Sequence, residues 1–159
     1  MSQPLPLIIG IGNEYRGDDA AGLIVARRLK ARLADSVIVL EQSGDGAALI
    51  EAWRGAQTVT IIDATMSGAA PGTIHRFDAT VQPIPAVSFH GSTHAFSLAE
   101  AIELACALCQ LPSRLVVYGI EGKNFAAGVG LSAEVETAVG EAVRRALSEL
   151  QTELTRLQS

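Results

Sequence analysis

The sequence is poor in the features that mark membrane, nucleic-acid-binding and disulfide-bonded proteins. No apolar stretch approaches the roughly 20 residues needed to cross a bilayer, and no basic region precedes the first apolar run. No cluster of Lys and Arg exceeds the short run at 27–32, and the net charge is −5, which argues against a nucleic-acid partner. We therefore expect a cytoplasmic protein that binds neither a membrane nor nucleic acid.

Cysteine is also scarce. Cys106 and Cys109, the two in the chain, lie three residues apart on the apolar face of a predicted helix, so we expect buried thiols in the core. A redox pair would need polar or basic neighbours, and a zinc knuckle would need a second pair of cysteines. The sequence offers neither.

The length of 159 residues and the hydrophobic content of 48% allow one well-buried domain, 1–159, and are too small for two ordinary ones. No internal repeat or low-complexity segment divides the chain. The tail after about residue 150 is expected to fray.

Predicted strands and helices alternate along the first part of the chain, which is typical of a parallel sheet covered on both faces. The strands are expected at 7–11, 37–40, 57–62, 73–77 and 114–119, and the helices at 18–34, 47–53, from 92–97 to about 110, and from 132 to about 150. Ser97 and Glu100 have the spacing of a capping box. Only nine residues separate Asp63 from Thr73, too few for a helical crossover, so strand 73–77 is expected to run antiparallel. The sequence thus predicts an α/β fold: a single three-layer domain with a mostly parallel five-stranded sheet, one antiparallel edge strand and helices on both faces.

The stretch 7–22 joins an apolar strand to a helix through a glycine-rich turn with two acidic residues, Asp18 and Asp19. It does not match the dinucleotide fingerprint, because Tyr15 stands where the third glycine belongs. Acidic residues at a helix start also repel phosphate, since they occupy the dipole end that an anion needs. Two interpretations stay open: the carboxylates cap the helix, or they belong to a site.

Acidic and imidazole side chains follow several of the predicted strands. Asp18 and Asp19 follow the first strand, Asp63 the third, Glu121 the fifth, and His94 opens the next helix. The carboxyl ends of parallel strands share one edge of the sheet, where such folds bind ligands. Two of these carboxylates and the imidazole, drawn from three separate segments, form a mixed oxygen and nitrogen ligand set. Such a set suits a divalent ion such as zinc, nickel or manganese.

Each of these residues also has an ordinary structural interpretation. Asp63 can cap a turn, and His94 can be a half-buried residue at a helix start. His90 is a second candidate for the imidazole ligand, and His75, in the edge strand, is expected to face solvent. The zinc-protease pattern HExxH is absent, and Ser92 and Thr93, beside His94, do not make a recognisable nucleophile arrangement.

Five segments, in order along nearly the whole chain, resemble the hydrogenase maturation endopeptidase family. They are GIGNEYRGDDAAG at 10–22, IIDA at 61–64, APGT at 70–73, HAFSLAEAI at 94–102 and GIEGKNFAAGVGLSAEV at 119–135. The resemblance implies a five-stranded α/β fold and a nickel-dependent endopeptidase. Its reaction is the removal of a C-terminal extension from the large-subunit precursor of a nickel-iron hydrogenase, once nickel has been installed.

The resemblance also assigns a site. Its metal-contacting and catalytic positions fall on Asp19, Asp63 and His94, and Asp18, Asn13 and Glu121 are expected to support the site or bind substrate. The nickel is carried by the substrate, and other divalent ions can occupy the same place. The first metal position is often glutamate in relatives, and GIEGKNF replaces a proline-containing loop of some relatives, which leaves the identity of the partner hydrogenase open.

Two mechanisms and two rival functions follow. Either the metal polarises the scissile carbonyl or activates water, or a carboxylate such as Asp19 or Asp18 acts as general base while nickel serves recognition. The rival functions are a non-catalytic checkpoint that binds the nickel site of the precursor, and a small-metabolite or nucleotide-binding domain. We expect a monomer that meets its partner transiently.

Overall fold

A computed structural model describes residues 3–85 and 96–159. Their strands form one five-stranded sheet in the order β2-β1-β3-β5-β4. The strands are β1 (Leu7–Ile11), β2 (Ile38–Gln42), β3 (Thr58–Thr65), β4 (Ile74–Asp78) and β5 (Arg114–Glu121). All neighbours are parallel except β4 and β5, which pair antiparallel. The predicted α/β sheet with one antiparallel edge strand is therefore confirmed.

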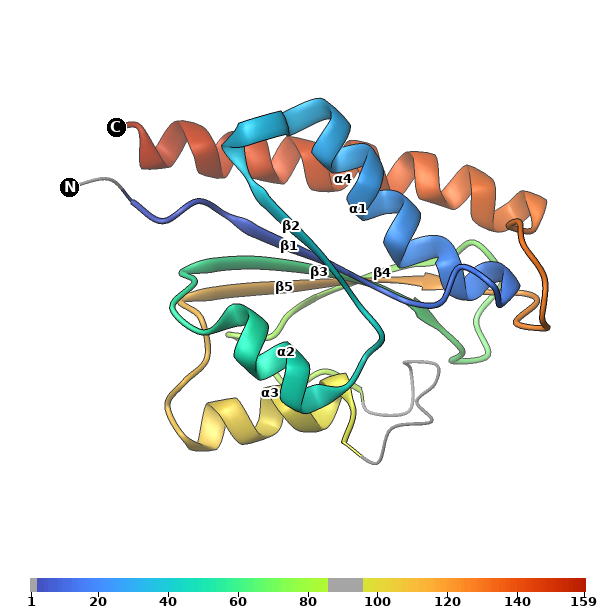
Figure 1. Cartoon of the computed structure of the whole chain (residues 1–159), viewed down its shortest axis with the longest axis horizontal. Helices are drawn as coiled ribbons and strands as arrows, with labels where there is room; N and C mark the ends of the chain where they lie inside the picture. Colours follow the sequence, from blue (N-terminus) through green and yellow to red (C-terminus); the bar gives the residue numbers. More distant parts are fainter. Residues whose placement is uncertain (1–2, 86–95) are drawn as a thin grey trace.

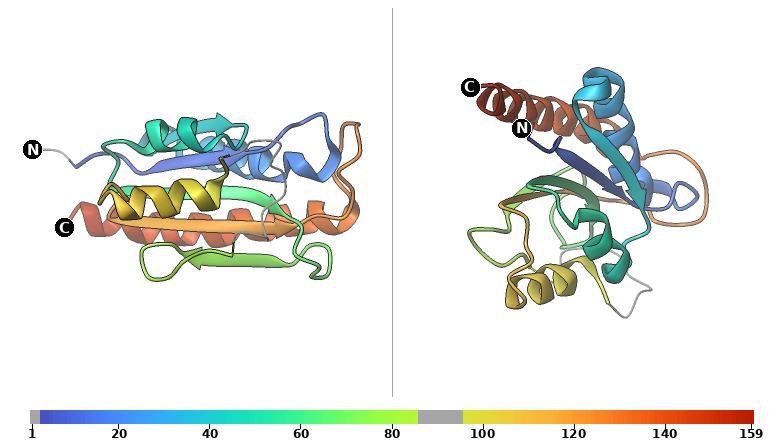
Figure 2. Two further views of the ribbon diagram at one scale, coloured as in Figure 1. Left: turned by 90° about the horizontal axis from the view of Figure 1, so that it is seen from below. Right: turned by 60° about the vertical axis from the view of Figure 1, so that its left-hand side comes forward.

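Helices cover both faces of this sheet (Figure 1). They are α1 (Ala21–Leu33), α2 (Gly46–Trp53), α3 (Leu98–Ala107) and α4 (Ala133–Leu157), with one-turn 3-10 helices at η1 (Gly17–Ala20) and η2 (Ala34–Ser36). The pair α1 and α4 lies on one face and the pair α2 and α3 on the other, as the turned views show (Figure 2). Each pair closes its own hydrophobic cluster, so β1 and β3, in the middle, are buried along their whole length. The predicted capping box of Ser97 and Glu100 is present at the start of α3.

The first helix lies directly on the backbone of two strands. A Cβ atom at Gly22 would lie 2.3 Å from the carbonyl oxygen of Ile62 and 2.5 Å from that of Ile11. One at Gly10 would lie 2.6 Å from the carbonyl oxygen of Gly22. Because only glycine permits this approach, Gly10 in β1 and Gly22 in α1 allow the start of α1, and the acidic residues before it, to lie against the ends of β1 and β3.

The last helix is longer than the sequence predicted. The expectation that the tail frays after about residue 150 is wrong, since α4 continues to Leu157. Its last turns stay on the sheet because Leu150 and Glu153 are buried and Leu154 packs against the core. Glu153 also accepts a hydrogen bond from the hydroxyl of Thr58, at the start of β3.

The expectation of buried thiols is also wrong. Cys106 and Cys109 are both exposed. The buried face of α3 is formed by Leu98, Ala101, Ile102 and Ala105. The helix ends at Ala107, three residues before the predicted end, and Cys109 has a φ of 55°, so the two cysteines do not share a helical face.

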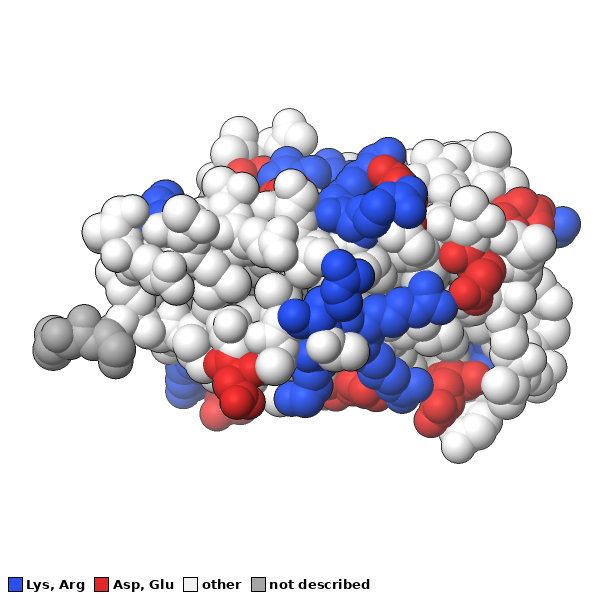
Figure 3. Space-filling model, turned by 90° about the horizontal axis from the view of Figure 1, so that it is seen from above, with Lys and Arg blue, Asp and Glu red and all other residues white. Residues whose placement is uncertain are grey.

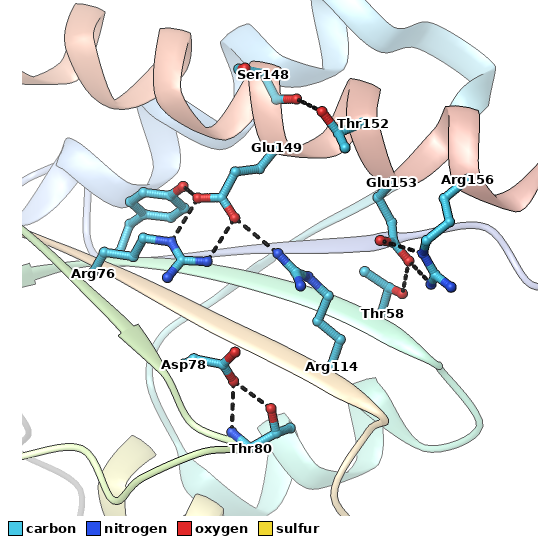
Figure 4. Close-up of polar contacts among 11 residues, drawn as sticks. Thr58, Arg76, Asp78, Thr80, Arg114, Ser148, Glu149, Thr152, Glu153 and Arg156 are labelled. Atoms are coloured by element: carbon cyan, nitrogen blue, oxygen red, sulfur yellow. Dashed lines mark hydrogen bonds and ion pairs between the residues drawn. The ribbon is translucent and has the colours of Figure 1, made fainter.

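A cluster of polar residues ties α4 to the β4–β5 edge of the sheet (Figure 4). The guanidinium of Arg76 donates two hydrogen bonds to Glu149, at 2.7 and 2.9 Å, and Arg114 donates another at 3.1 Å. The hydroxyl of Tyr118 donates to the same carboxylate. Burial raises the pKa of Glu149, but the hydrogen bonds from Arg76 and Tyr118 outweigh it and the net pKa is lowered.

The outer face of α1 and α4 carries many basic side chains, interspersed with acidic ones (Figure 3). The basic residues of the run at 27–32, Arg27, Arg28, Lys30 and Arg32, are exposed as predicted. Arg27 pairs with Glu41 and Arg28 with Glu136, both at 2.8 Å. None of the helices in the described part of the chain has the length and apolar character of a membrane span.

Candidate active site at the carboxyl ends of the parallel strands

The candidate site lies where the strand order reverses. The chain leaves β1 for its neighbour β2, and then crosses back to β3 on the other side of β1. Asp19 lies in η1, directly after the loop that follows β1, and Asp63 lies near the carboxyl end of β3. Crevices at such reversals are the usual ligand sites of open α/β sheets.

Asp63 is a buried carboxyl group beside a second acidic residue. It is 4% exposed, and its Oδ1 accepts a hydrogen bond of 2.8 Å from the backbone N–H of Ala64. Burial raises the pKa of Asp63 well above its usual value, and the charge of Asp19 raises it further, against the opposing effect of the Ala64 hydrogen bond. The structure therefore brings together two of the three residues expected to contact metal.

Asp18 is used differently from its neighbour. Its side chain is fully buried and accepts hydrogen bonds from the backbone N–H groups of Lys123, Asn124 and Ser132 and from the hydroxyl of Ser132, at 2.7–2.9 Å. Burial raises the pKa of Asp18, but these bonds outweigh it and the net pKa is lowered. Because four donors occupy the lone pairs of this carboxylate, Asp18 is a poor candidate for a general base. Its hydrogen bonds instead fix the loop between β5 and α4.

Three backbone N–H groups of the η1 turn already donate to carbonyl oxygens of the chain. The N–H of Gly17 donates to the carbonyl of Gly128 at 2.9 Å and that of Asp18 to Asn124 at 2.9 Å. The N–H of Asp19 donates to Arg16 at 3.1 Å. A phosphate site at a helix N-terminus needs such groups free and a positive local field, so this turn does not fit a nucleotide.

Asn13 shapes the loop that follows β1. Its side-chain Oδ1 accepts from the N–H of Tyr15 at 2.9 Å, and its own N–H donates to the carbonyl of Asp19 at 3.3 Å. It also lines a shallow cavity of about 360 Å³ at the carboxyl ends of β1 and β2. The walls of this cavity are formed by Gly12, Asn13, Glu14, Tyr15, Leu23, Arg27, Glu41, Gln42 and Ser43.

Glu121 is buried at the end of β5, where it anchors the turn that follows β3. Its carboxylate accepts from the hydroxyl of Thr65 at 2.9 Å, and from the backbone N–H and hydroxyl of Ser67 at 2.9 and 2.6 Å. Burial raises the pKa of Glu121, but the hydrogen bonds from Ser67 and Thr65 lead to a net lowering. Glu121 lies at the strand ends, as predicted. Its observed hydrogen bonds stabilise the turn between β3 and β4.

The expectation that His75 faces solvent is wrong. Its side chain is 23% exposed, and its Nε2 lies 3.3 Å from a carboxylate oxygen of Glu121. The ring also stacks on Phe77, with 6.2 Å between centroids. The antiparallel register places His75 opposite Gly119, two residues before Glu121 and on the same face of the sheet. This pairing could not be deduced from the sequence, because the register of β4 was unknown.

His94 lies outside the described residues, as do His90, Ser92 and Thr93. Among residues 3–85 and 96–159, no three His, Cys, Asp or Glu side chains are grouped so that they could hold a metal ion. The described part of the site is thus a pair of carboxylates, and the imidazole ligand stays a prediction.

Comparison with known proteins gives the family. A family model described as hydrogenase maturation protease matches residues 23–149. A protein of Methanocaldococcus jannaschii, named provisionally as a hydrogenase maturation protease, is 32% identical over 156 residues, covering 91% of this chain and 96% of that protein. The hydrogenase 2 maturation protease of Escherichia coli is 26% identical over 149 residues, covering 91% of this chain and 90% of its own.

Solved structures agree with this match. The hydrogenase maturating endopeptidase HybD from Escherichia coli has the same fold, with a TM-score of 0.77, 22% identity and 94% of both chains covered. The [NiFe] hydrogenase maturation protease HybD from Thermococcus kodakarensis has a TM-score of 0.72 and 28% identity, with 92% of this chain and 99% of its own covered. The motif resemblance is thereby confirmed, and the chain belongs to the hydrogenase maturation protease family.

Proposed function

We propose that this protein is an endopeptidase that removes the C-terminal extension of a nickel-iron hydrogenase large-subunit precursor after nickel insertion. Family membership supports peptidase activity in hydrogenase maturation. The single observation that carries the site is the Asp19–Asp63 pair at the strand-order reversal, where the charge of one acid raises the pKa of the other, which is buried. We place the reaction in the cytoplasm and expect a monomer that meets its substrate transiently.

A divalent cation would turn this unfavourable pair into a favourable one. Two neighbouring carboxylates repel each other, and the burial of Asp63 disfavours its charged form. A metal ion between them offsets both costs, and a mixed set of oxygen and imidazole ligands suits nickel. In our proposal the ion is nickel that is part of the substrate, and Asp19, Asp63 and His94 complete its coordination when the precursor docks.

The chain then contributes recognition and proton transfer. With the nickel-bearing precursor seated, the scissile peptide lies beside the carboxylate pair. One route of hydrolysis uses the substrate's metal to polarise the carbonyl or activate water. The other uses Asp19 as a general base toward water, with nickel serving recognition alone. Asp18 is left out of both routes because its carboxylate is held by the β5–α4 loop.

The test is the intact mass of a precursor after incubation with this protein, with nickel-loaded and nickel-free samples run in parallel. We expect loss of a C-terminal peptide in the loaded sample alone, and no cleavage by Asp19→Asn or Asp63→Asn. Cleavage of both samples would refute the nickel requirement. Binding of a cognate precursor without any change of mass would identify the protein as a non-catalytic checkpoint for the nickel site.

A further inference from the structure

Two loops from opposite ends of the chain are joined into one ridge beside the candidate site. We define the paired loops as residues 13–17, after β1, and residues 122–132, between β5 and α4. The N–H of Gly17 donates to Gly128, and the N–H of Gly128 donates to the carbonyl of Tyr15, at 2.9 and 2.8 Å. The backbones of Arg16 and Gly128 thus form a parallel β-bridge. Figures 1 and 2 show both loops together at the same end of the molecule.

A buried charge holds this ridge in place. The carboxylate of Asp18 accepts hydrogen bonds from Lys123 and Asn124 at the start of the second loop and from Ser132 at its end. Burying a carboxylate costs free energy that only such bonds offset. The loop is therefore anchored at both ends, and the chain uses a buried acidic residue to fix the position of an exposed segment.

Two large apolar side chains of the paired loops are exposed to water, beside polar ones such as Glu14 and Lys123. Val129 is 82% exposed and Tyr15 is 65% exposed. They lie on neighbouring segments, because the bridge joins Arg16 to Gly128, the residues next to them. Side chains this exposed remove little apolar surface from water, so they contribute little to the folding free energy. Exposed apolar residues on neighbouring segments of a protein surface can mark a site that binds another protein.

The ridge is continuous with the candidate site. The N–H of Asn13 donates to the carbonyl of Asp19, and Tyr15 is one wall of the 360 Å³ cavity at the ends of β1 and β2. A molecule that covers Tyr15 therefore lies next to the turn that carries Asp19.

We propose that Tyr15 and Val129 bind an apolar patch on the surface of the protein substrate, next to the segment that is cut. The inference rests on the proposed function, because it names the docking surface of that same site. A membrane is a poor occupant, since Glu14 stands beside Tyr15 and the net charge of −5 repels anionic lipid. A fixed ridge suits a folded protein, because neither loop has to be ordered when the partner binds.

The experiment compares the Tyr15→Ser/Val129→Ser double variant with the wild type in steady-state cleavage of the nickel-loaded precursor. We expect KM to rise about tenfold or more, the usual effect of removing an aromatic anchor from an interface. We expect kcat at saturating precursor to stay within about twofold of the wild type, because neither residue belongs to the carboxylate pair. Melting temperatures of all variants show whether the fold is intact.

Val81→Ser is the matched control. Val81 is 78% exposed, nearly as much as Val129, and follows the end of β4. Asp78 at that end pairs with Val116 near the start of β5, so Val81 lies at the opposite end of the sheet from the site. This variant should have the KM and kcat of the wild type.

Each result has a distinct meaning. A double variant with unchanged KM, beside an active wild type, would overturn the docking surface and leave the proposed function standing. An equal rise of KM in Val81→Ser would overturn it as well, since the effect would not be local. A wild-type protein that neither binds nor cuts the precursor would overturn the proposed function and the inference with it. A wild-type dimer that the double variant dissociates would assign the ridge to a second copy of the chain and refute the proposal.

Discussion

The carboxyl group of Asp63 lies within reach of the charge of Asp19, which adds to burial in raising its pKa. The pair disfavours folding, because one member is almost completely buried and the two repel each other when both are ionised. Such pairs of acidic residues are typical of functional sites, where binding or catalysis is maintained at a cost in stability.

Asp63→Asn should stabilise the fold at neutral pH while abolishing cleavage. Because the pKa of Asp63 is raised in the folded state, stability falls as the pH rises from 3.8, the unfolded value, through the folded value. Asparagine carries no charge, and its side-chain oxygen can still accept from Ala64. We expect a larger free energy of unfolding than that of the wild type at pH 7, measured by urea unfolding monitored by circular dichroism. A variant less stable than the wild type at pH 7 would contradict this account of the pair.

Asp18→Asn and Asp19→Asn, at adjacent positions, should differ in their effect on stability: the first should destabilise the fold and the second should not. Asparagine at 18 places an NH₂ group against N–H donors, so it loses part of the four-bond network of Asp18. The cost should be about 2–3 kcal/mol of unfolding free energy, since hydrogen bonds to a buried charge are strong. Limited proteolysis within 122–132 should become faster in that variant.

The Asp19→Asn variant serves as its control. It removes a carboxylate that the pair disfavours, so its melting temperature should equal or exceed that of the wild type, while cleavage of the nickel-loaded precursor should be lost. Equal destabilisation by both substitutions would show that the two residues do not have separate roles.

Much of the architecture could be predicted because it depends on local pattern. The β1 run is continuous and apolar, and the nine residues before Thr73 are too few for a crossover, so the antiparallel β4 followed directly. Placing Asp19 and Asp63 at one edge of the sheet needed only the rule that parallel strands share their carboxyl ends.

The errors concern contacts between distant segments. The Asp18 network joins residues more than 100 positions apart, and no periodicity in the sequence reports it. The contact between His75 and Glu121 depends on the register of β4 against β5. The sequence does not give this register, so it predicts a solvent-facing His75. Cys106 is exposed because it lies within α3 but outside its buried face, and Cys109 is exposed because the helix has already ended at Ala107.

His94→Ala should abolish cleavage of the nickel-loaded precursor and leave the melting temperature unchanged. This residue lies outside the described part of the chain, and its role comes from the family motif at 94–102. Loss of an imidazole ligand should reduce affinity for the nickel-bearing precursor as well as the cleavage rate. His90→Ala is the matched control, and normal processing by His94→Ala together with loss in His90→Ala would move the ligand to His90.

Glu149→Gln should weaken the fold in a pH-dependent way, far from the site. Burial raises the pKa of Glu149, but hydrogen bonds from Arg76 and Tyr118 lower it overall, so its stabilising effect is complete above the unfolded value of 4.5 and is lost as the pH falls through the folded value. We expect a loss on the order of 2 kcal/mol at pH 7, with the stabilities of the two proteins converging as the pH falls below the folded pKa of Glu149. Glu141→Gln, on the same helix, removes ion pairs with the exposed Arg144 and Arg145, and it should change little because water screens these pairs. A difference between wild type and Glu149→Gln that persists unchanged into acid would show that packing of the side chain, and not its charge, holds α4 on the sheet.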